Sequence, residues 1–146
     1  MNEKIQSPTP GEITPDAVNA GNRHTLMETL GIKFTHVSPG RAEAMMLVEK
    51  RVCQPFGILH GGATLALAET VAGQGSLILC EPGEVPAGLQ VSCNHISSAK
   101  EGDTVRAVGT IIHKGRSTHV WNVDIFSPAG KLVSSVRVVN SILKKQ

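Results

Sequence analysis

One long apolar segment, residues 63–79, constrains the fold of this chain more than any other feature. The segment is rich in Ala and Leu, and Glu69 is its only charged residue. A helix that is apolar on nearly all sides is a buried helix. The seventeen residues of this segment would span roughly 25 Å as a helix, about the width of a small domain. The segment therefore predicts a central helix that the rest of the chain wraps.

Glu69 stands out within this helix, because a carboxylate in apolar surroundings costs free energy unless a partner or a function compensates for it. Partial burial would also leave the carboxylate poorly solvated and more reactive. Glu69 is therefore a candidate catalytic residue. The alternative is a solvated glutamate on an exposed helix face, with no chemical role.

The residues that open the helix, His60, Gly61 and Gly62, form a second feature. The first N–H groups of a helix have no partner within it and carry a partial positive charge, and residues without Cβ let a ligand approach the backbone closely. Together these residues predict a seat for an oxyanion or a polarised carbonyl. The alternative is a simple turn, in which His60 is an N-cap or a core histidine with its hydrogen bonds satisfied.

Alternation of apolar and polar residues predicts β-strands on both sides of the helix. Two strands precede it and four follow it, at residues 32–37, 42–48, 89–97, 104–113, 118–126 and 131–143. In the first strand, His36 is expected on the apolar face with Ile32 and Phe34. Short links make sequence neighbours pair antiparallel. One curved antiparallel sheet around one long central helix satisfies this order, which makes the fold α+β. Trp121 is expected in the core or in an interface.

The residues before the first strand predict two regions. Residues 16–30 are expected to form one short amphipathic helix, capped by Thr14 or Asp16 and stopped by Gly31. Residues 1–15 contain three prolines and are expected to form a flexible lead-in, without the apolar stretch of a signal peptide.

Length and composition place residues 16–146 in a single globular domain. The charged fraction is 18% and the net charge is +2, without the basic patch that marks a nucleic-acid-binding protein. The cysteines, Cys53, Cys80 and Cys93, are odd in number and lack paired spacing, and the histidines lack metal-ligand spacing. We therefore expect no disulfide framework, no metal and no cofactor. We also expect a cytoplasmic protein without a membrane span, because its one long apolar run is interrupted by polar residues.

The residues around the helix start resemble a known family. Residues 54–63, followed by Leu67-Ala68-Glu69-Thr70, resemble the signature of the hotdog-fold acyl-CoA thioesterases. The most similar branch contains the 4-hydroxybenzoyl-CoA thioesterases of the Arthrobacter type and the bacterial 1,4-dihydroxy-2-naphthoyl-CoA thioesterases. The resemblance covers roughly residues 30–143 and includes shorter matches at 94–96, 99–102, 113–117 and 120–121. It implies a long helix in a curved antiparallel sheet, and dimers that pair again into tetramers.

The resemblance also implies roles for individual residues. Glu69 falls on the catalytic carboxylate, and Gly61 on the residue whose backbone N–H polarises the thioester carbonyl. Gln54 falls on a glutamine that positions the thioester or the water, and His60 on the family's histidine. Gly62 lies beside them in the substrate site.

One position departs from the family pattern. One turn after the carboxylate, the relatives carry a Ser or Thr, where this chain has Gly73. Gln74 and Ser76 are nearby, and Ser76, about two turns after Glu69, carries a hydroxyl that could contact the substrate or water; the sequence leaves open which group holds the water. His95 would line the acyl pocket, or would be a histidine of the sheet whose hydrogen bonds are satisfied within the protein. A basic turn would hold the coenzyme A phosphates, or be a solvated hairpin; it consists of Lys114, Gly115, Arg116 and Ser117.

These roles fit the chemistry of thioester hydrolysis. The carbonyl oxygen becomes negatively charged in the transition state, and one fixed donor such as Gly61 N–H is typically worth ~3–4 kcal/mol there. Glu69 would act as a general base toward water or as a nucleophile, and the sequence leaves both open. The expected function is hydrolysis of a small aromatic or medium-chain acyl-CoA to the free acid and coenzyme A. A non-catalytic acyl-CoA-binding domain is the alternative, which Gly73 supports, and a dehydratase of the same fold ranks last.

The spacing of the site residues predicts how the site is assembled. His60 and Glu69 are nine positions apart, which on a helix is about two and a half turns and roughly 13 Å along the axis. Their side chains would therefore point to opposite sides of the helix. The two residues of one chain therefore cannot contact the same thioester. Two chains packed antiparallel could bring Glu69 of one to Gly61 of the other. We expect a homodimer with two equivalent sites that the chains share.

Overall fold

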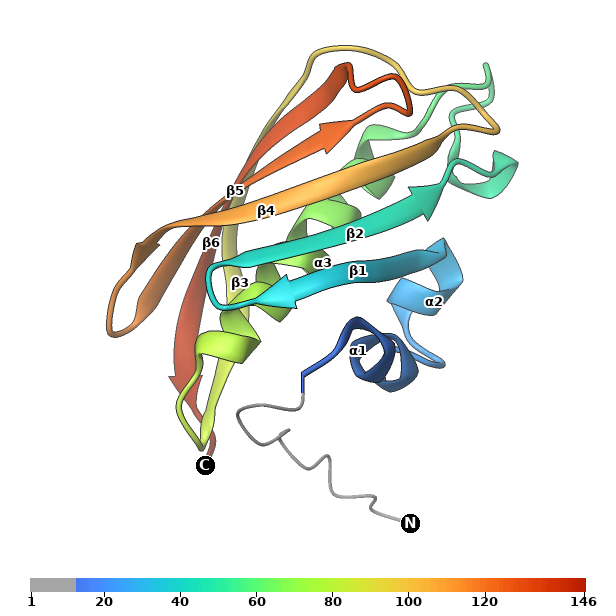
Figure 1. Cartoon of the computed structure of the whole chain (residues 1–146). Helices are drawn as coiled ribbons and strands as arrows, with labels where there is room; N and C mark the ends of the chain where they lie inside the picture. Colours follow the sequence, from blue (N-terminus) through green and yellow to red (C-terminus); the bar gives the residue numbers. More distant parts are fainter. Residues whose placement is uncertain (1–12) are drawn as a thin grey trace.

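A curled six-stranded antiparallel sheet holds one long helix against its inner face (Figure 1). The computed structural model describes residues 13–146. The helix is α3 (Gly61–Leu79), and the strand order is β1-β2-β4-β5-β6-β3, so that β1 and β3 are the edges. The strands are β1 (Ile32–Ser38), β2 (Arg41–Leu47), β3 (Glu84–His95), β4 (Thr104–Lys114), β5 (Thr118–Phe126) and β6 (Leu132–Lys144). The predicted α+β hotdog architecture is therefore confirmed.

The N-terminal region forms two helices, so the prediction of one helix over 16–30 is wrong. These are α1 (Pro15–Gly21) and α2 (Leu26–Leu30), and the chain turns between them through His24 at φ 61°. The Thr14 side chain caps α1 by accepting from Ala17 N–H, and Gly31 ends α2 in the left-handed conformation at φ 73°. Pro15, predicted as the last residue of the lead-in, is instead the first residue of α1. Residues 1–12 lie outside the described part of the chain.

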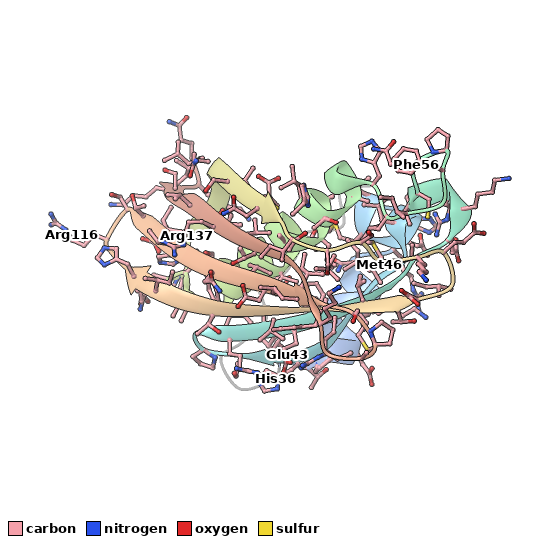
Figure 2. All side chains as sticks on the ribbon, turned by 90° about the horizontal axis from the view of Figure 1, so that it is seen from above. His36, Glu43, Met46, Phe56, Arg116 and Arg137 are labelled. Atoms are coloured by element: carbon pink, nitrogen blue, oxygen red, sulfur yellow. The ribbon has the colours of Figure 1, made fainter. Side chains whose placement is uncertain are left out.

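A bulge in β1 places His36 on the outer face of the sheet, and this corrects the prediction that His36 faces the core. The register between β1 and β2 shifts between Phe34 and His36, so that His36 lies opposite Glu43 and Val37 lies opposite Ala42. Figure 2 shows His36 and Glu43 on the same side of the sheet. An extra residue in one strand exchanges the faces of all residues that follow it.

The start of β3 also differs from the prediction: the strand begins at Glu84 rather than at Leu89. Pro86 and Gly88 concealed this part of the strand, since neither residue favours a sheet interior. Pro86 is tolerated because β3 is an edge strand. The register with β6 shifts between Gly88 and Gln90, which makes Leu89 a bulge residue with 65% of its surface exposed.

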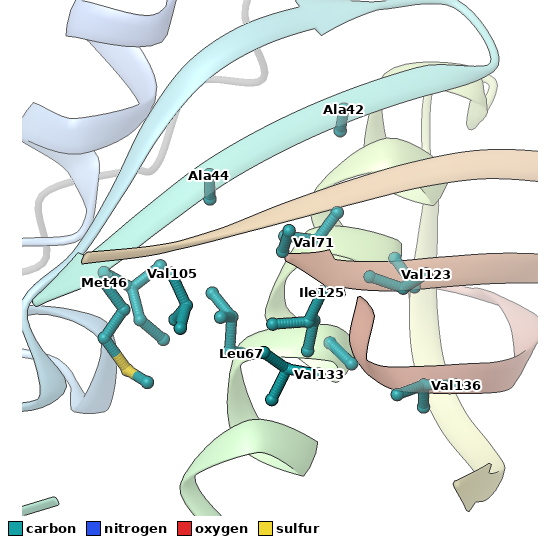
Figure 3. Close-up of a cluster of buried hydrophobic side chains, with 14 of the residues drawn as sticks. Ala42, Ala44, Met46, Leu67, Val71, Val105, Val123, Ile125, Val133 and Val136 are labelled. Atoms are coloured by element: carbon teal, nitrogen blue, oxygen red, sulfur yellow. The ribbon is translucent and has the colours of Figure 1, made fainter. Parts of the chain in front are cut away.

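The core lies between the inner face of the sheet and one side of α3 (Figure 3). Trp121, Val123 and Ile125 of β5 are fully buried and alternate with partly exposed residues, as expected for a strand with one covered face. The helix contributes fully buried Leu67 and Val71. The prediction of Trp121 as a core residue is confirmed.

Within one chain the helix is not covered on all sides, and here the sequence-based expectation is wrong. The side that carries Gly62, Glu69 and Leu77 is exposed, with Leu77 exposed to 42%. An apolar sequence shows that a helix face avoids water. It does not show whether the chain's own sheet or another molecule covers that face.

Candidate active site

The N-terminus of α3 leaves one backbone N–H available to a ligand. The His60 side chain caps the helix, because its Nδ1 accepts from Gly62 N–H at 2.8 Å. The His60 carbonyl accepts from the N–H groups of Ala63 and Thr64 at 3.1 and 3.2 Å. Among residues 13–146, Gly61 N–H donates no hydrogen bond. The helix start therefore presents the Gly61 amide, where the partial positive charge of a helix end also acts. The N-cap alternative for His60 is confirmed.

The two glycines are required by histidine rings rather than by open space for a ligand. A Cβ at Gly61 would lie 2.8 Å from His95 Nε2, and a Cβ at Gly62 would lie 3.0 Å from His60 Nδ1. Both distances are well inside van der Waals contact, so side chains at these positions would displace the rings or the helix start. We expected the missing Cβ atoms to leave room for a ligand. Instead, the space beside both glycines is occupied by histidine rings.

A cavity of about 330 Å³ opens beside Gly61. Gln54, Gly61 and His95, which the sequence assigned to one site, line this cavity together. The remaining lining residues are mostly apolar or carry hydroxyl groups: Phe56, Ile58, Leu59, Thr64, Ile96, Ser97, Ser98, Ala99, Val133 and Ser134. A largely apolar cavity with a few convergent polar groups is typical of a small-molecule site.

A tight turn holds Gln54 at the cavity. Gln54 N–H donates to the Ile58 carbonyl at 2.8 Å, and the Gln54 carbonyl accepts from Gly57 N–H at 3.0 Å. Gly57 has φ 89°, a left-handed conformation that glycine adopts without strain. The turn therefore fixes the position of the glutamine backbone relative to the helix start.

Glu69 does not line this cavity. It lies on the exposed side of α3, beside the edge strand, where its Oε1 would be 3.6 Å from a Cβ on Gly88. Within one chain the carboxylate is therefore exposed rather than partly buried as expected. Within one chain, Glu69 and Gly61 therefore do not line the same cavity.

The hydroxyl proposed to replace the one missing at Gly73 is inaccessible. Ser76 is fully buried, and its Oγ lies 2.8 Å from Trp121 Nε1, 3.0 Å from Asn140 Nδ2 and 3.0 Å from His119 Nδ1. Ser76 and Glu69 have nearly the same angular position on α3. Ser76 lies two turns farther along the helix, however, and there β5 and β6 cross over this side of α3. We therefore correct the assignment of Ser76 to the substrate site. Apart from the neighbouring helix backbone, no atom of residues 13–146 lies within 4 Å of a Cβ placed on Gly73.

The basic turn lies far from the cavity of its own chain. Lys114, Arg116 and Ser117 are exposed and Gly115 is half-buried. Figure 2 shows Arg116 at the opposite end of the molecule from Phe56, which lines the cavity. One chain therefore does not bring this turn and the Gly61 amide to the same ligand.

Sequence reasoning missed Ser134 as a cavity residue. Ser134 is fully buried and lies opposite His95 across the β3–β6 pair, with 2.9 Å between Ser134 Oγ and His95 Nδ1. Only the strand register reveals this pair, because 39 positions separate the two residues. Cys93 Sγ lies 3.7 Å from the same nitrogen, and burial raises the pKa of the Cys93 thiol.

Residues 13–146 contain neither a cluster of metal ligands nor a membrane-spanning helix. No group of three or more His, Cys, Asp or Glu side chains is placed to hold a metal ion. None of the helices there is both long enough and apolar enough to cross a membrane.

Comparison with known proteins places the chain in a family. Residues 56–134 match the model of the thioesterase superfamily. The chain is 38% identical to the 1,4-dihydroxy-2-naphthoyl-CoA hydrolase of Escherichia coli K12, over 90% of this chain and 96% of the relative. It is 34% identical to the proofreading thioesterase EntH of Cronobacter turicensis, over 90% of this chain and 95% of the relative.

The solved structures agree with these sequence relatives. A thioesterase from Haemophilus influenzae superposes with a TM-score of 0.87 at 32% identity, covering 92% of this chain and 94% of that chain. The free amide at the helix start, the adjoining cavity and these similarities lead to one conclusion: this chain belongs to the thioesterase superfamily and is a thioester hydrolase with the hotdog fold.

Proposed function

We propose that this protein hydrolyses a small aromatic or medium-chain acyl-CoA to the free acid and coenzyme A, at sites shared by two chains. The observation that carries the proposal is the available Gly61 N–H beside the cavity, combined with the exposure of Glu69 on an uncovered helix side. One chain supplies a donor for the oxyanion, and the carboxylate comes from the other.

Two surface features support a dimer of this kind. The edge strand β3 pairs only with β6 among the described strands, so its outer edge has backbone groups available for another molecule. The exposed side of α3 adjoins it and carries small residues that permit close approach of a second helix. In an antiparallel pair, Glu69 of each chain would lie near Gly61 of its partner. We propose that two such dimers form a tetramer, as the resemblance implies.

The proposed roles follow from the positions of the residues. Gly61 N–H donates to the thioester oxygen, where a fixed donor stabilises the negative charge of the transition state. Glu69 activates water or attacks the carbonyl itself. Gln54 orients the thioester or the water, and Gly62 and the capping His60 hold the helix start. His95 contacts the acyl group.

Coenzyme A would be held by a different part of the assembly. Lys114, Gly115, Arg116 and Ser117 lie at the exposed β4–β5 turn, where the two cations suit phosphate groups. Because this turn is far from the cavity of its own chain, the phosphates are contacted by the turn of another chain.

Similarities to individual proteins support the site and the substrate class. A thioesterase from Staphylococcus aureus, 41% identical over 80–82% of this chain, has been crystallised with a glutamine replaced by alanine and separately with a glutamate replaced by alanine. Those two positions are as far apart in its sequence as Gln54 and Glu69 are here. The Escherichia coli relative is named for an aromatic acyl-CoA, which supports an aromatic substrate.

The direct test replaces Glu69 by Gln and measures release of coenzyme A from benzoyl-CoA with a thiol reagent. We expect turnover to fall by at least about 100-fold, because the variant has neither a base nor a nucleophile. Glu81→Gln, a charge-matched change at an exposed position outside the site, should retain turnover. Normal turnover by Glu69→Gln would remove this residue from the mechanism. Binding of benzoyl-CoA in calorimetry without thiol release by the unaltered protein would instead favour the non-catalytic alternative.

A further inference from the structure

Ser134 and His95 form a pair that the proposed roles do not yet explain. The two residues lie directly opposite each other where β3 ends against β6. Ser134 Oγ is 2.9 Å from His95 Nδ1, and Ser134 is fully buried, whereas His95 is exposed at the cavity. The other ring nitrogen, Nε2, lies on the side of Gly61. The pair therefore links a buried hydroxyl to the residue that carries the available amide.

The burial of Ser134 determines the direction of this hydrogen bond. A buried hydroxyl that does not donate a hydrogen bond loses free energy. Within the described chain, the acceptors near Ser134 Oγ are the His95 Nδ1 lone pair and the Cys93 sulfur, and sulfur is a weak acceptor. The hydroxyl therefore donates to Nδ1. In a neutral imidazole this leaves the proton on Nε2.

We propose that Ser134 is a positioning residue that holds His95 as the Nε2–H tautomer, so that His95 presents a hydrogen-bond donor to the acyl thioester beside Gly61 N–H. The assignment of a ligand to this donor rests on the proposed function. The tautomer itself depends only on the Ser134–His95 contact. Two donors in one cavity suit a carbonyl oxygen, which has two lone pairs.

A serine and a histidine at this distance could also be a nucleophile and its base. Although Ser134 contributes to the cavity lining, none of its surface is exposed, and this argues against the role because a nucleophile must reach the thioester carbon. The two roles differ in outcome: a nucleophilic serine would carry a covalent acyl group during turnover, and a positioning serine would not.

The first experiment observes the tautomer in the whole, unliganded protein. Nitrogen NMR of protein labelled with ¹⁵N-histidine should show His95 protonated at Nε2, with the signal identified by its loss in His95→Gln. Ser134→Ala should shift this signal toward a mixture of tautomers. The matched control is Ser135→Ala, which removes the neighbouring hydroxyl that donates to Asp124 and should leave the His95 signal unchanged. Protonation at Nδ1 in the unaltered protein would overturn the proposal.

The second experiment asks whether Ser134 acts through His95. Ser134→Ala should lower kcat/KM for benzoyl-CoA about threefold to tenfold, the effect of one lost hydrogen bond. In a His95→Gln background the same change should have almost no further effect. A full additional loss in the double variant, or an acyl group found on Ser134 by mass spectrometry, would contradict a positioning role. If the unaltered protein hydrolyses no acyl-CoA, the proposed function fails, whereas the NMR result still decides the tautomer.

Discussion

Replacing Ser76 by Ala should destabilise the fold while leaving the chemistry of the folded protein nearly unchanged. Trp121 Nε1 and Asn140 Nδ2 both donate to Ser76 Oγ, so the hydroxyl proton is left to donate to His119 Nδ1. Alanine would leave the buried Trp121 N–H and the His119 nitrogen without partners, whereas Asn140 keeps its bond to the Ala72 carbonyl. At about 1–3 kcal/mol for each of these two unsatisfied groups, the expected loss is about 2–6 kcal/mol in the free energy of unfolding.

Urea unfolding followed by the fluorescence of Trp121, the only tryptophan, measures this loss. Protein concentration must be equal in all samples, because dissociation contributes to the stability of an oligomer. Ser135→Ala is the control and should cost less than Ser76→Ala, because Ser135 and Asp124 are only partly buried and water can replace their lost hydrogen bond. A Ser76→Ala variant of unchanged stability would refute the reasoning. So would one that is stable but loses kcat/KM, since the hydroxyl would then serve the substrate.

Three further predictions concern single positions. Gly61→Ala should lower kcat/KM about 100-fold or more in the thiol-release assay, because its Cβ cannot coexist with the His95 ring in its present place; an active variant would show that the ring does not confine this position. Burial lowers the pKa of His119, so the folded state resists the proton that the unfolded histidine accepts near its ordinary pKa of about 6.5. The urea midpoint should therefore be highest above this pH and should fall as the pH is lowered toward about 5.5. In His119→Gln the midpoint should fall less steeply with pH. Equal slopes of midpoint against pH in the two proteins would exclude His119 as the cause. Arg116→Ala should raise KM for benzoyl-CoA about threefold to tenfold, but not for a benzoyl thioester of N-acetylcysteamine, which lacks the phosphates; equal effects on both substrates would remove Arg116 from phosphate binding.

The parts of the structure that local pattern determines could be predicted from the sequence. The apolar run gave α3, and strict alternation around Trp121 gave β5 with its bounds, Thr118–Phe126. The turn with Gln54 and the helix start with Gly61 line one cavity, because they are close in the sequence.

What could not be predicted depends on contacts between distant parts of the chain. The β1 bulge is invisible in a pattern of alternation, so the pattern predicts the wrong face for His36. The hydroxyl of Ser76 is in line with Glu69 on the helix, and only the crossing of β5 and β6 shows that it is buried. Position 61 is confined by the ring of His95, which lies at the C-terminal end of β3 and occupies the space that a Cβ would need.

The central claim is that each site takes Glu69 from one chain and the cavity with Gln54 from another. Hybrid dimers of Glu69→Gln and Gln54→Ala chains, isolated with two different affinity tags, test this claim most directly. If the sites are shared, one of the two sites in each hybrid is intact, and the hybrid should recover about half of the unaltered activity. If each site lies within a single chain, both sites carry a substitution, and the hybrid would be no more active than its parent variants.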